Sequence, residues 1–180
     1  MTDERREYGV CYNDGPLTGR LVISGSTTSS DYFMMVTVAD GQRHTGLPNS
    51  GAAIDPSGGF GGLNAIDVED QYTRIEWLEV RGDADGGHGI FFDDSPAADD
   101  GLVSNIFVHS YVQSANSGVE IGAQSVTVRN SFFTGSTSVG IHLFTGSSAT
   151  IENCTLYGDG AAGSGVDDEA GSTATVRNTI

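Results

Sequence analysis

The sequence predicts an all-β fold built as a solenoid of about six stacked coils. Three observations predict it. A motif of about 24 residues recurs through the second half of the chain, and each copy holds short runs that alternate apolar and polar residues with period two. Glycine, at 26 of 180 residues, is also about twice its usual share of ~7%. Helices fit badly, because apolar residues do not recur at helical spacing.

The repeat is visible in two independent registers. Aligned segments read TRIEWLEVRG, LVSNIFVHSY, VTVRNSFFTG, ATIENCTLYG and ATVRNTI, and their shared anchor positions, 28, 25, 23 and 25 residues apart, are Trp77, Asn105, Asn130, Asn153 and Asn178. A second register is a glycine followed by Ile or Val, at Gly89-Ile90, Gly118-Val119, Gly140-Ile141 and Gly165-Val166. Two registers with one period indicate units that stack directly on one another.

The stacking predicts columns of like side chains, one residue per coil and ~4.8 Å apart. The inward columns are Ile75, Val103, Val128, Ile151, Val176 and Val80, Val108, Phe133, Leu156. An outward column of Glu76, Ser104, Arg129, Glu152 and Arg177 ends in charges of alternating sign, which helps to fix register. Asparagine at the anchor tolerates left-handed φ, and its amide can bond to the Asn of the next coil.

In these repeats the chain resembles the right-handed parallel β-helix proteins of the pectin-lyase-like superfamily, whose coils carry such Asn ladders. The resemblance covers about residues 64–180 and implies a single-stranded right-handed parallel β-helix. It also implies carbohydrate as the ligand class, by analogy of fold alone.

The first half is less regular. Four segments separated by turn clusters are predicted as strands, and these are Leu17–Ile23, Tyr32–Val38, Ala52–Ile54 and Ala65–Val68. Asp3–Glu7 is expected to be a solvated start, and Val38–Gly46 a loop that carries an arginine and a histidine. We expect one continuous domain, with irregular coils and a cap over residues 1–63 and regular coils over residues 64–180.

The chain stops at Ile180, in the middle of a unit and without a polar cap. A solenoid needs a cap, because its last coil otherwise exposes core and unpaired strand edges. We expect either that the sequence is a piece of a longer protein or that this open end stacks head-to-tail on another copy.

The charge balance excludes some partners. All eight basic residues are Arg, against 24 acidic residues, for a net charge of −16. Binding to nucleic acid or to an anionic membrane needs a basic surface, so neither is expected. No apolar run is long enough to span a membrane, and the opening MTDERREY is no signal peptide. The spacing of Cys11 and Cys154 matches no known metal-binding motif. We expect two free thiols, with a disulfide between them as the alternative.

The candidate catalytic residues are Glu120, His142 and Asp167, which follow the Gly-Ile/Val anchor in the same outward column as Phe91. The column predicts an imidazole flanked by carboxylates on neighbouring coils, about 5 Å apart. Such surroundings favour the charged imidazole and suit acid–base chemistry. The alternative is that these residues form an outward polar column whose members merely pair.

The candidate metal ligands are the acidic residues Asp83, Asp85, Asp93 and Asp94. Hard cations such as Ca²⁺ take six to eight oxygen ligands, which carboxylates and Gly-rich turns supply. The segment from Asp83 begins like an EF-hand loop but has no Glu at its twelfth position. Ca²⁺ is therefore a possible cofactor, and solvated charge is the alternative. The spacing of the four histidines suggests no zinc site.

The candidate ligand-binding residues are the aromatic side chains Phe107, Phe132 and Tyr111. Phe107 and Phe132 share one outward column and would form an exposed apolar strip, on which flat sugar rings could stack. The alternative is that a lateral loop or a neighbouring domain covers them. Gly87-His88-Gly89 resembles a short motif of polygalacturonases, but the Asp pair follows it here instead of preceding it, so the match does not indicate that activity.

The function expected from this sequence is that of a non-catalytic extracellular β-helix module, part of a larger surface or secreted protein, that binds polysaccharide along one face of the solenoid. One alternative is a polysaccharide lyase or glycoside hydrolase that uses the row Glu120, His142 and Asp167. The other is a structural, stacking or fibre segment.

Overall fold

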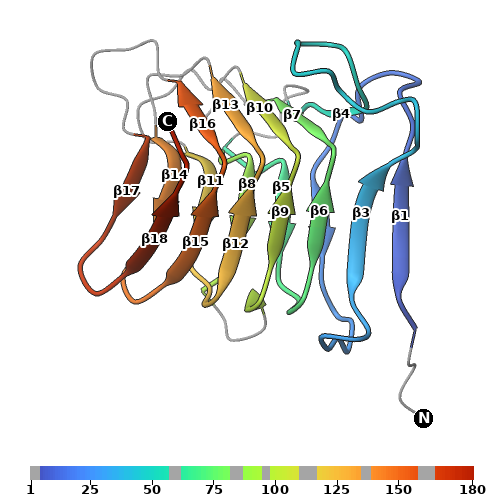
Figure 1. The fold of residues 1–180 in the computed structure, drawn as a ribbon. Helices are drawn as coiled ribbons and strands as arrows, with labels where there is room; N and C mark the ends of the chain where they lie inside the picture. The colour runs from blue at the N-terminus through green and yellow to red at the C-terminus, as the bar shows by residue number, and fades with distance from the viewer. Residues whose placement is uncertain are drawn as a thin grey trace.

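The computed structural model describes residues 5–56, 62–81, 87–94, 98–109, 117–134, 139–157 and 165–180. Within these residues the chain is all β, and its strands form three parallel sheets that run along the axis of a solenoid of about six coils. Figure 1 shows the coils side by side, from β1 near the N-terminus to β18 near the C-terminus. The predicted fold class is confirmed.

The described strands fall into one sheet of seven, one of five and one of six. Sheet A holds β1 (Glu7–Cys11), β3 (Met34–Val38), β6 (Arg74–Glu76), β9 (Leu102–Ser104), β12 (Val126–Arg129), β15 (Ser148–Glu152) and β18 (Thr173–Arg177). Sheet B holds β4 (Ala53–Ile54), β7 (Glu79–Arg81), β10 (Phe107–His109), β13 (Phe132–Thr134) and β16 (Thr155–Tyr157). Sheet C holds β2 (Leu21–Ile23), β5 (Ile66–Val68), β8 (Ile90–Phe92), β11 (Ser117–Ile121), β14 (Val139–Leu143) and β17 (Val166–Asp168).

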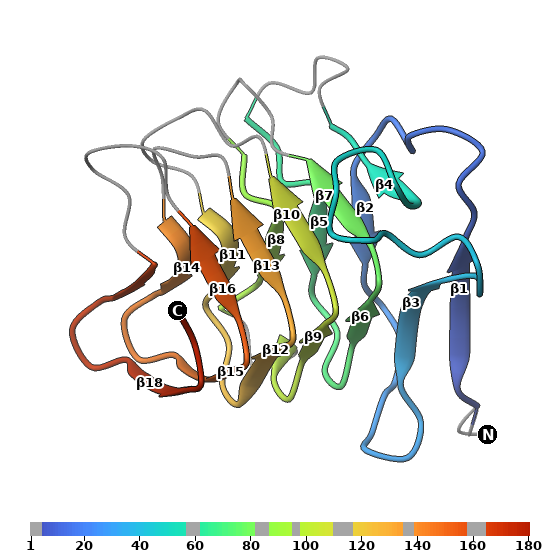
Figure 2. The ribbon, with the colours of Figure 1, turned by 45° about the horizontal axis from the view of Figure 1, so that its top comes forward.

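Each regular coil contributes one strand to A, then one to B, then one to C. Figure 2 shows the strands of sheet B in front of those of sheet C. Every strand pairs in parallel with the strand one coil away, so the sequence period becomes the pairing register. Val128 pairs with Val103 on one side and with Ile151 on the other, as the predicted inward column requires.

The core is the stack of inward columns enclosed by the three sheets. Ile75, Val103, Val128 and Ile151 are all fully buried, and Val80 and Val108 of the second column are equally closed to solvent. The last members of the two predicted columns differ, because Val176 is 48% exposed and Leu156 is only half-buried. Burial of the other column residues stabilises each coil against its neighbours by removing apolar surface from water.

The Asn anchors take the left-handed backbone conformation that the repeat predicts. Asn105, Asn130, Asn153 and Asn178 have φ between 47° and 53°, and Trp77 at the same turn has φ 66°. The amide of Asn153 donates to Asn130 Oδ1 at 3.2 Å, and the amide of Asn178 donates to Asn153 Oδ1 at 3.3 Å. The ladder therefore joins successive coils along one edge between sheets A and B.

The outward column of sheet A follows the predicted register. Arg177 Nη1 lies 2.9 Å from Glu152 Oε1, which confirms the pairing of opposite charges on neighbouring coils. Ser104 in the same column is fully buried, so its position is outward in register but not exposed.

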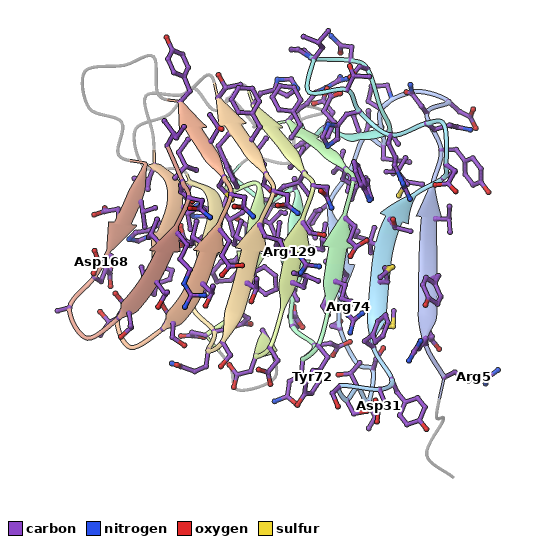
Figure 3. The ribbon with its side chains drawn as sticks, viewed as in Figure 1. Arg5, Asp31, Tyr72, Arg74, Arg129 and Asp168 are labelled. Atoms are coloured by element: carbon purple, nitrogen blue, oxygen red, sulfur yellow. The ribbon has the colours of Figure 1, made fainter. Side chains whose placement is uncertain are left out.

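The first coil differs from the prediction in two places. Residues Glu7–Cys11 form a strand, β1, which pairs with β3, where a solvated start was expected to reach Glu7. The predicted strand Leu17–Ile23 is shortened to β2, and Leu17 keeps only an isolated bridge to Ile54. Figure 3 shows Arg5 at this end of the solenoid and Asp168 of β17 at the other.

Both cysteines carry free thiols, as favoured. Cys154 is buried and Cys11 is half-buried, and burial raises the pKa of both thiols. Among the described residues, no helix is long and apolar enough to cross a membrane.

Candidate functional site

The predicted catalytic row lies on the outer face of sheet C. Parallel pairing sets Phe91 beside Glu120, Glu120 beside His142, and His142 beside Asp167. The adjacency that the period predicted is therefore present on strands β8, β11, β14 and β17. What these side chains contact decides what the row can do.

Glu120 is the centre of the row, with 5% of its surface exposed. Ser117 Oγ donates to its Oε2 at 3.0 Å, and the same oxygen lies 2.6 Å from His88 Nδ1. His142 Nδ1 is farther away, at 3.6 Å. A buried carboxylate is tolerated only when it is paired and hydrogen-bonded, and Glu120 meets that requirement within its own face.

Sequence reasoning missed His88 and Ser117. Both come directly before an anchor glycine, Gly89 in one coil and Gly118 in the next, so they are equivalent positions on neighbouring coils. The backbone bond from Gly89 N to Ser117 O, at 3.0 Å, holds these two turns together. Extending the glycine register by one residue would have found the pair.

His142 lies between two carboxylates, but one of them differs from the prediction. Its Nδ1 faces Glu120, and its Nε2 lies 3.8 Å from Glu169 Oε1. Among the described residues Asp167 forms no ion pair with His142, although it occupies the adjacent register position, and its side chain is exposed. The second flanking carboxylate, Glu169, comes from the turn after β17. The repeat period predicts positions within strands and does not predict the position of a turn residue.

Glu169 is held in its charged form. Its Oε2 accepts hydrogen bonds from the Thr145 hydroxyl at 2.7 Å and from the Thr145 backbone N–H at 3.0 Å. These two bonds lower the pKa of Glu169, and the charge of His142 adds to the effect. Glu169 is therefore an acceptor and an anion at neutral pH, not a proton donor.

The row continues toward the first coil through Asp67, which pairs with Phe91. Asp67 is buried and accepts a hydrogen bond from Asn64 Nδ2 at 2.6 Å. Arg20 forms an ion pair with the other Asp67 oxygen. Sheet C thus presents a continuous band of carboxylates, imidazoles and rings across β5, β8, β11 and β14.

The geometry limits the chemistry that this band can perform. A nucleophilic relay needs the serine on one imidazole nitrogen and the carboxylate on the other. In this site a single nitrogen, His88 Nδ1, lies 2.8 Å from Ser117 Oγ and 2.6 Å from Glu120 Oε2. Ser117 is also buried and donates to Glu120, so its hydroxyl is not set up to attack a substrate.

The predicted metal ligands are only partly described. Asp83 and Asp85 lie outside the described residues, whereas Asp93 and Asp94 follow β8 at the carboxyl end of sheet C. A hydrogen bond that the protonated Asp94 donates to Asp93, together with the negative charge of Asp93, raises the pKa of Asp94. Within the described ranges no three His, Cys, Asp or Glu side chains gather in a way that could hold a metal.

The predicted aromatic strip lies on sheet B. The rings of Phe107 and Phe132 stack with centroids 5.4 Å apart and planes within 7°. Phe107 is only 1% exposed, because His44 from the loop between β3 and β4 packs against it at 5.9 Å, and Phe132 is half-buried. The strip exists, but a lateral loop covers Phe107. Tyr111 lies outside the described residues.

Beside Phe107 the sheet carries a charged group that sequence reasoning also missed. Glu79, in register with Phe107, contacts Arg81 Nε at 3.0 Å and His109 Nε2 at 2.9 Å. Burial alone would raise the pKa of Glu79, but hydrogen bonds from Asn49, His109 and Arg81 outweigh it and lower that pKa.

Comparison with known proteins supports the fold and gives no closer relative. Neither the curated proteins nor the solved structures gave a match to this chain. The family described as a right handed beta helix region matches residues 64–180, which are the regular coils of the structure and more than half of the chain. The chain therefore belongs to the right-handed beta helix family.

Proposed function

We propose that the protein is a non-catalytic extracellular module that binds polysaccharide along the outer face of sheet C. The observation that carries the proposal is the band in which the half-buried Phe91 and His142 flank the buried Glu120 on three successive strands. Carboxylates and imidazoles can exchange hydrogen bonds with sugar hydroxyls, and rings can stack on sugar faces. A band that crosses the strands suits a long ligand that lies along the solenoid axis.

The contacts favour binding over catalysis. Glu120 is buried beneath its partners, and Glu169 is held as an anion. A glycosidase needs one carboxyl that stays protonated and a second at a defined separation across the scissile bond. The fixed hydrogen bonds of Glu120 instead support a preorganised surface, which lowers the entropic cost of binding.

The extracellular part of the proposal follows from the kind of ligand. Long polysaccharides are met mainly outside cells, and a net charge of −16 favours the solubility of a surface-exposed solenoid. Binding of Ca²⁺ through Asp93 and Asp94 belongs to the same proposal, because a cation would reduce repulsion between the protein and an acidic glycan.

Affinity electrophoresis through gels that contain a neutral β-glucan, an amino-glycan or a polyuronate tests the binding. We expect at least one polysaccharide to retard the wild type, and His142→Ala or the pair Asp167→Asn and Glu169→Gln to reduce the retardation at least threefold. Glu152→Gln on sheet A is the matched control and should behave as wild type. The proposal fails if no gel retards the protein, or if the control loses as much as the sheet C variants.

One observation favours an enzyme as the second candidate. His142 lies within 4 Å of carboxylate oxygens from two neighbouring coils, surroundings that suit a general base or acid in a polysaccharide lyase or glycoside hydrolase. New reducing ends or unsaturated products, formed by the wild type and lost in His142→Ala, would establish this candidate. Binding without turnover in both proteins would support the module.

A further inference from the structure

The chain between β3 and β4, residues 39–52, lies across the outer face of sheet B, and we name it the strap. Its Asn49 backbone N–H donates to Glu79 Oε1 at 3.0 Å. His44 Nε2 lies 2.8 Å from the carbonyl oxygen of Asn105, and the His44 ring packs on Phe107. The strap therefore contacts sheet B and the turn before it at several points. These include the Asn49 bond to the Glu79 carboxylate, the His44 contact with the Asn105 carbonyl oxygen, the His44 ring on Phe107, and a backbone bond from Glu79 N to Ala52 O at 3.1 Å.

The layer under the strap holds polar atoms without partners. Glu79 is 0% exposed, and its Oε1 accepts from Asn49, Arg81 and His109. Its second oxygen, Oε2, is buried and has no hydrogen-bond partner among the described residues. Arg43 Nε, on the strap itself, is also buried and has no hydrogen-bond partner among the described residues, although Arg43 pairs with Asp40 through Nη2. Folded proteins satisfy nearly all buried polar atoms, so the unmatched oxygen of Glu79 under the strap points to a missing partner.

The same layer contains an aromatic platform. Phe107 stacks on Phe132 on the next coil and on His109 at 4.8 Å. Phe107 is closed off beneath the strap, whereas Phe132 is half-buried. The platform thus begins at the covered Glu79 and extends one coil beyond Phe107, along the direction in which a linear ligand would lie.

We propose that this platform is a second saccharide-binding site and that the strap occupies it until a ligand displaces it. The strap makes the contacts that a sugar would make, because it places a flat ring on Phe107 and a donor on Glu79. A displacing sugar would stack on Phe107 and Phe132 and give a hydroxyl hydrogen to Glu79 Oε2. The ligand class rests on the function proposed above, but the residues and the sheet are different.

The single tryptophan of the chain reports on the strap. Trp77 lies 4.6 Å from the Arg43 guanidinium and 6.4 Å from the His44 ring, so lifting the strap removes a cation and a ring from its surroundings. Hexasaccharides of a neutral β-glucan, an amino-glycan and a polyuronate are titrated into the full chain while Trp77 fluorescence is followed. We expect a saturable change with at least one of them.

Three variants test the residues. His44→Ala removes the competing ring and should tighten apparent binding about 3–10-fold, since a larger fraction of the protein is then open to the ligand. Phe132→Leu should weaken the binding at least 10-fold. Tyr8→Leu, a similar change at an exposed ring on β1 of sheet A, outside both proposed sites, is the control and should leave the Trp77 titration unchanged. Circular dichroism confirms that each variant is folded.

Hydrogen exchange separates displacement of the strap from binding elsewhere. The Asn49 amide should exchange faster when the oligosaccharide is bound, because its bond to Glu79 is broken. The proposal is overturned if this amide exchanges at the same rate or more slowly, or if neither wild type nor His44→Ala gives a saturable response, the result expected if an internal water fills the layer. Retardation in the gels that depends on His142, without a Trp77 response, would keep the sheet C function and remove this site.

Discussion

His88 Nδ1 lies 2.6 Å from Glu120 Oε2, and this contact joins the turn before β8 to the outer face of β11. Glu120 in turn accepts from Ser117 on its own strand. The central carboxylate of sheet C is therefore part of the fold as well as of the candidate site. Any change at Glu120 has to be measured for stability before it is read as a change in function.

Replacing Glu120 with Ala should lower the free energy of unfolding by roughly 2–3 kcal/mol, because the buried Ser117 hydroxyl loses its acceptor and His88 loses its carboxylate partner. Urea unfolding followed by circular dichroism measures the loss. Asp167→Ala, an exposed neighbour in the same column, should cost about 0.5 kcal/mol or less. Equal losses in the two variants would show that the Glu120 contacts do not stabilise the protein.

The anchor glycines of sheet C make a second prediction. A Cβ at Gly118 would lie 2.7 Å from the Phe133 ring and 2.8 Å from the Gly140 carbonyl oxygen, whereas a Cβ at Gly165 would meet only Leu156, at 3.4 Å. Gly118→Ala should therefore destabilise by about 1–3 kcal/mol, and Gly165→Ala by less than about 1 kcal/mol. Thermal unfolding of the two variants side by side checks the order, and a reversed order would contradict the close packing at Gly118.

A third prediction concerns the Asn ladder. Asn130 has φ 51° and accepts from the Asn153 amide at 3.2 Å. Both Ala and Gly remove the amide, but only Gly adopts this backbone without strain, so Asn130→Ala should be less stable than Asn130→Gly by about 1 kcal/mol. Denaturation midpoints test this. Indistinguishable variants would mean that the left-handed turn contributes nothing to the preference for Asn.

The sequence was sufficient to predict what the coil period controls. Because the coils stack in parallel, residues about 24 positions apart pair on neighbouring strands. Val128 and Ile151 could therefore be placed in one column from the sequence alone. Strand β1 was missed although Tyr8 and Val10 alternate with Glu7 and Gly9, because the segment directly follows the charged opening residues and Glu7 to Val10 are all exposed.

The contacts made by turns and loops could not be predicted in this way. Glu169, rather than Asp167, faces His142 because Thr145 holds the turn after β17, and no period specifies a turn. The strap is a non-repeating insertion, so nothing in the columns indicated that His44 would cover Phe107. The site residues from strands were predictable in position, and their partners were not.

The fourth prediction is a pH dependence that comes from His44. Burial lowers the pKa of His44 below its ordinary 6.5, although the hydrogen bond to Asn105 and the charge of Glu79 oppose this. Between the lowered pKa of the folded state and about pH 6.5, the unfolded chain is protonated at His44 and the folded chain is not. The free energy of unfolding therefore decreases as the pH falls through this range. His44→Gln should lose this component. Unfolding midpoints at pH 7.5 and pH 5.5, followed by Trp77 fluorescence, should therefore differ more in wild type than in the variant. An equal shift in both would assign the pH dependence to other groups.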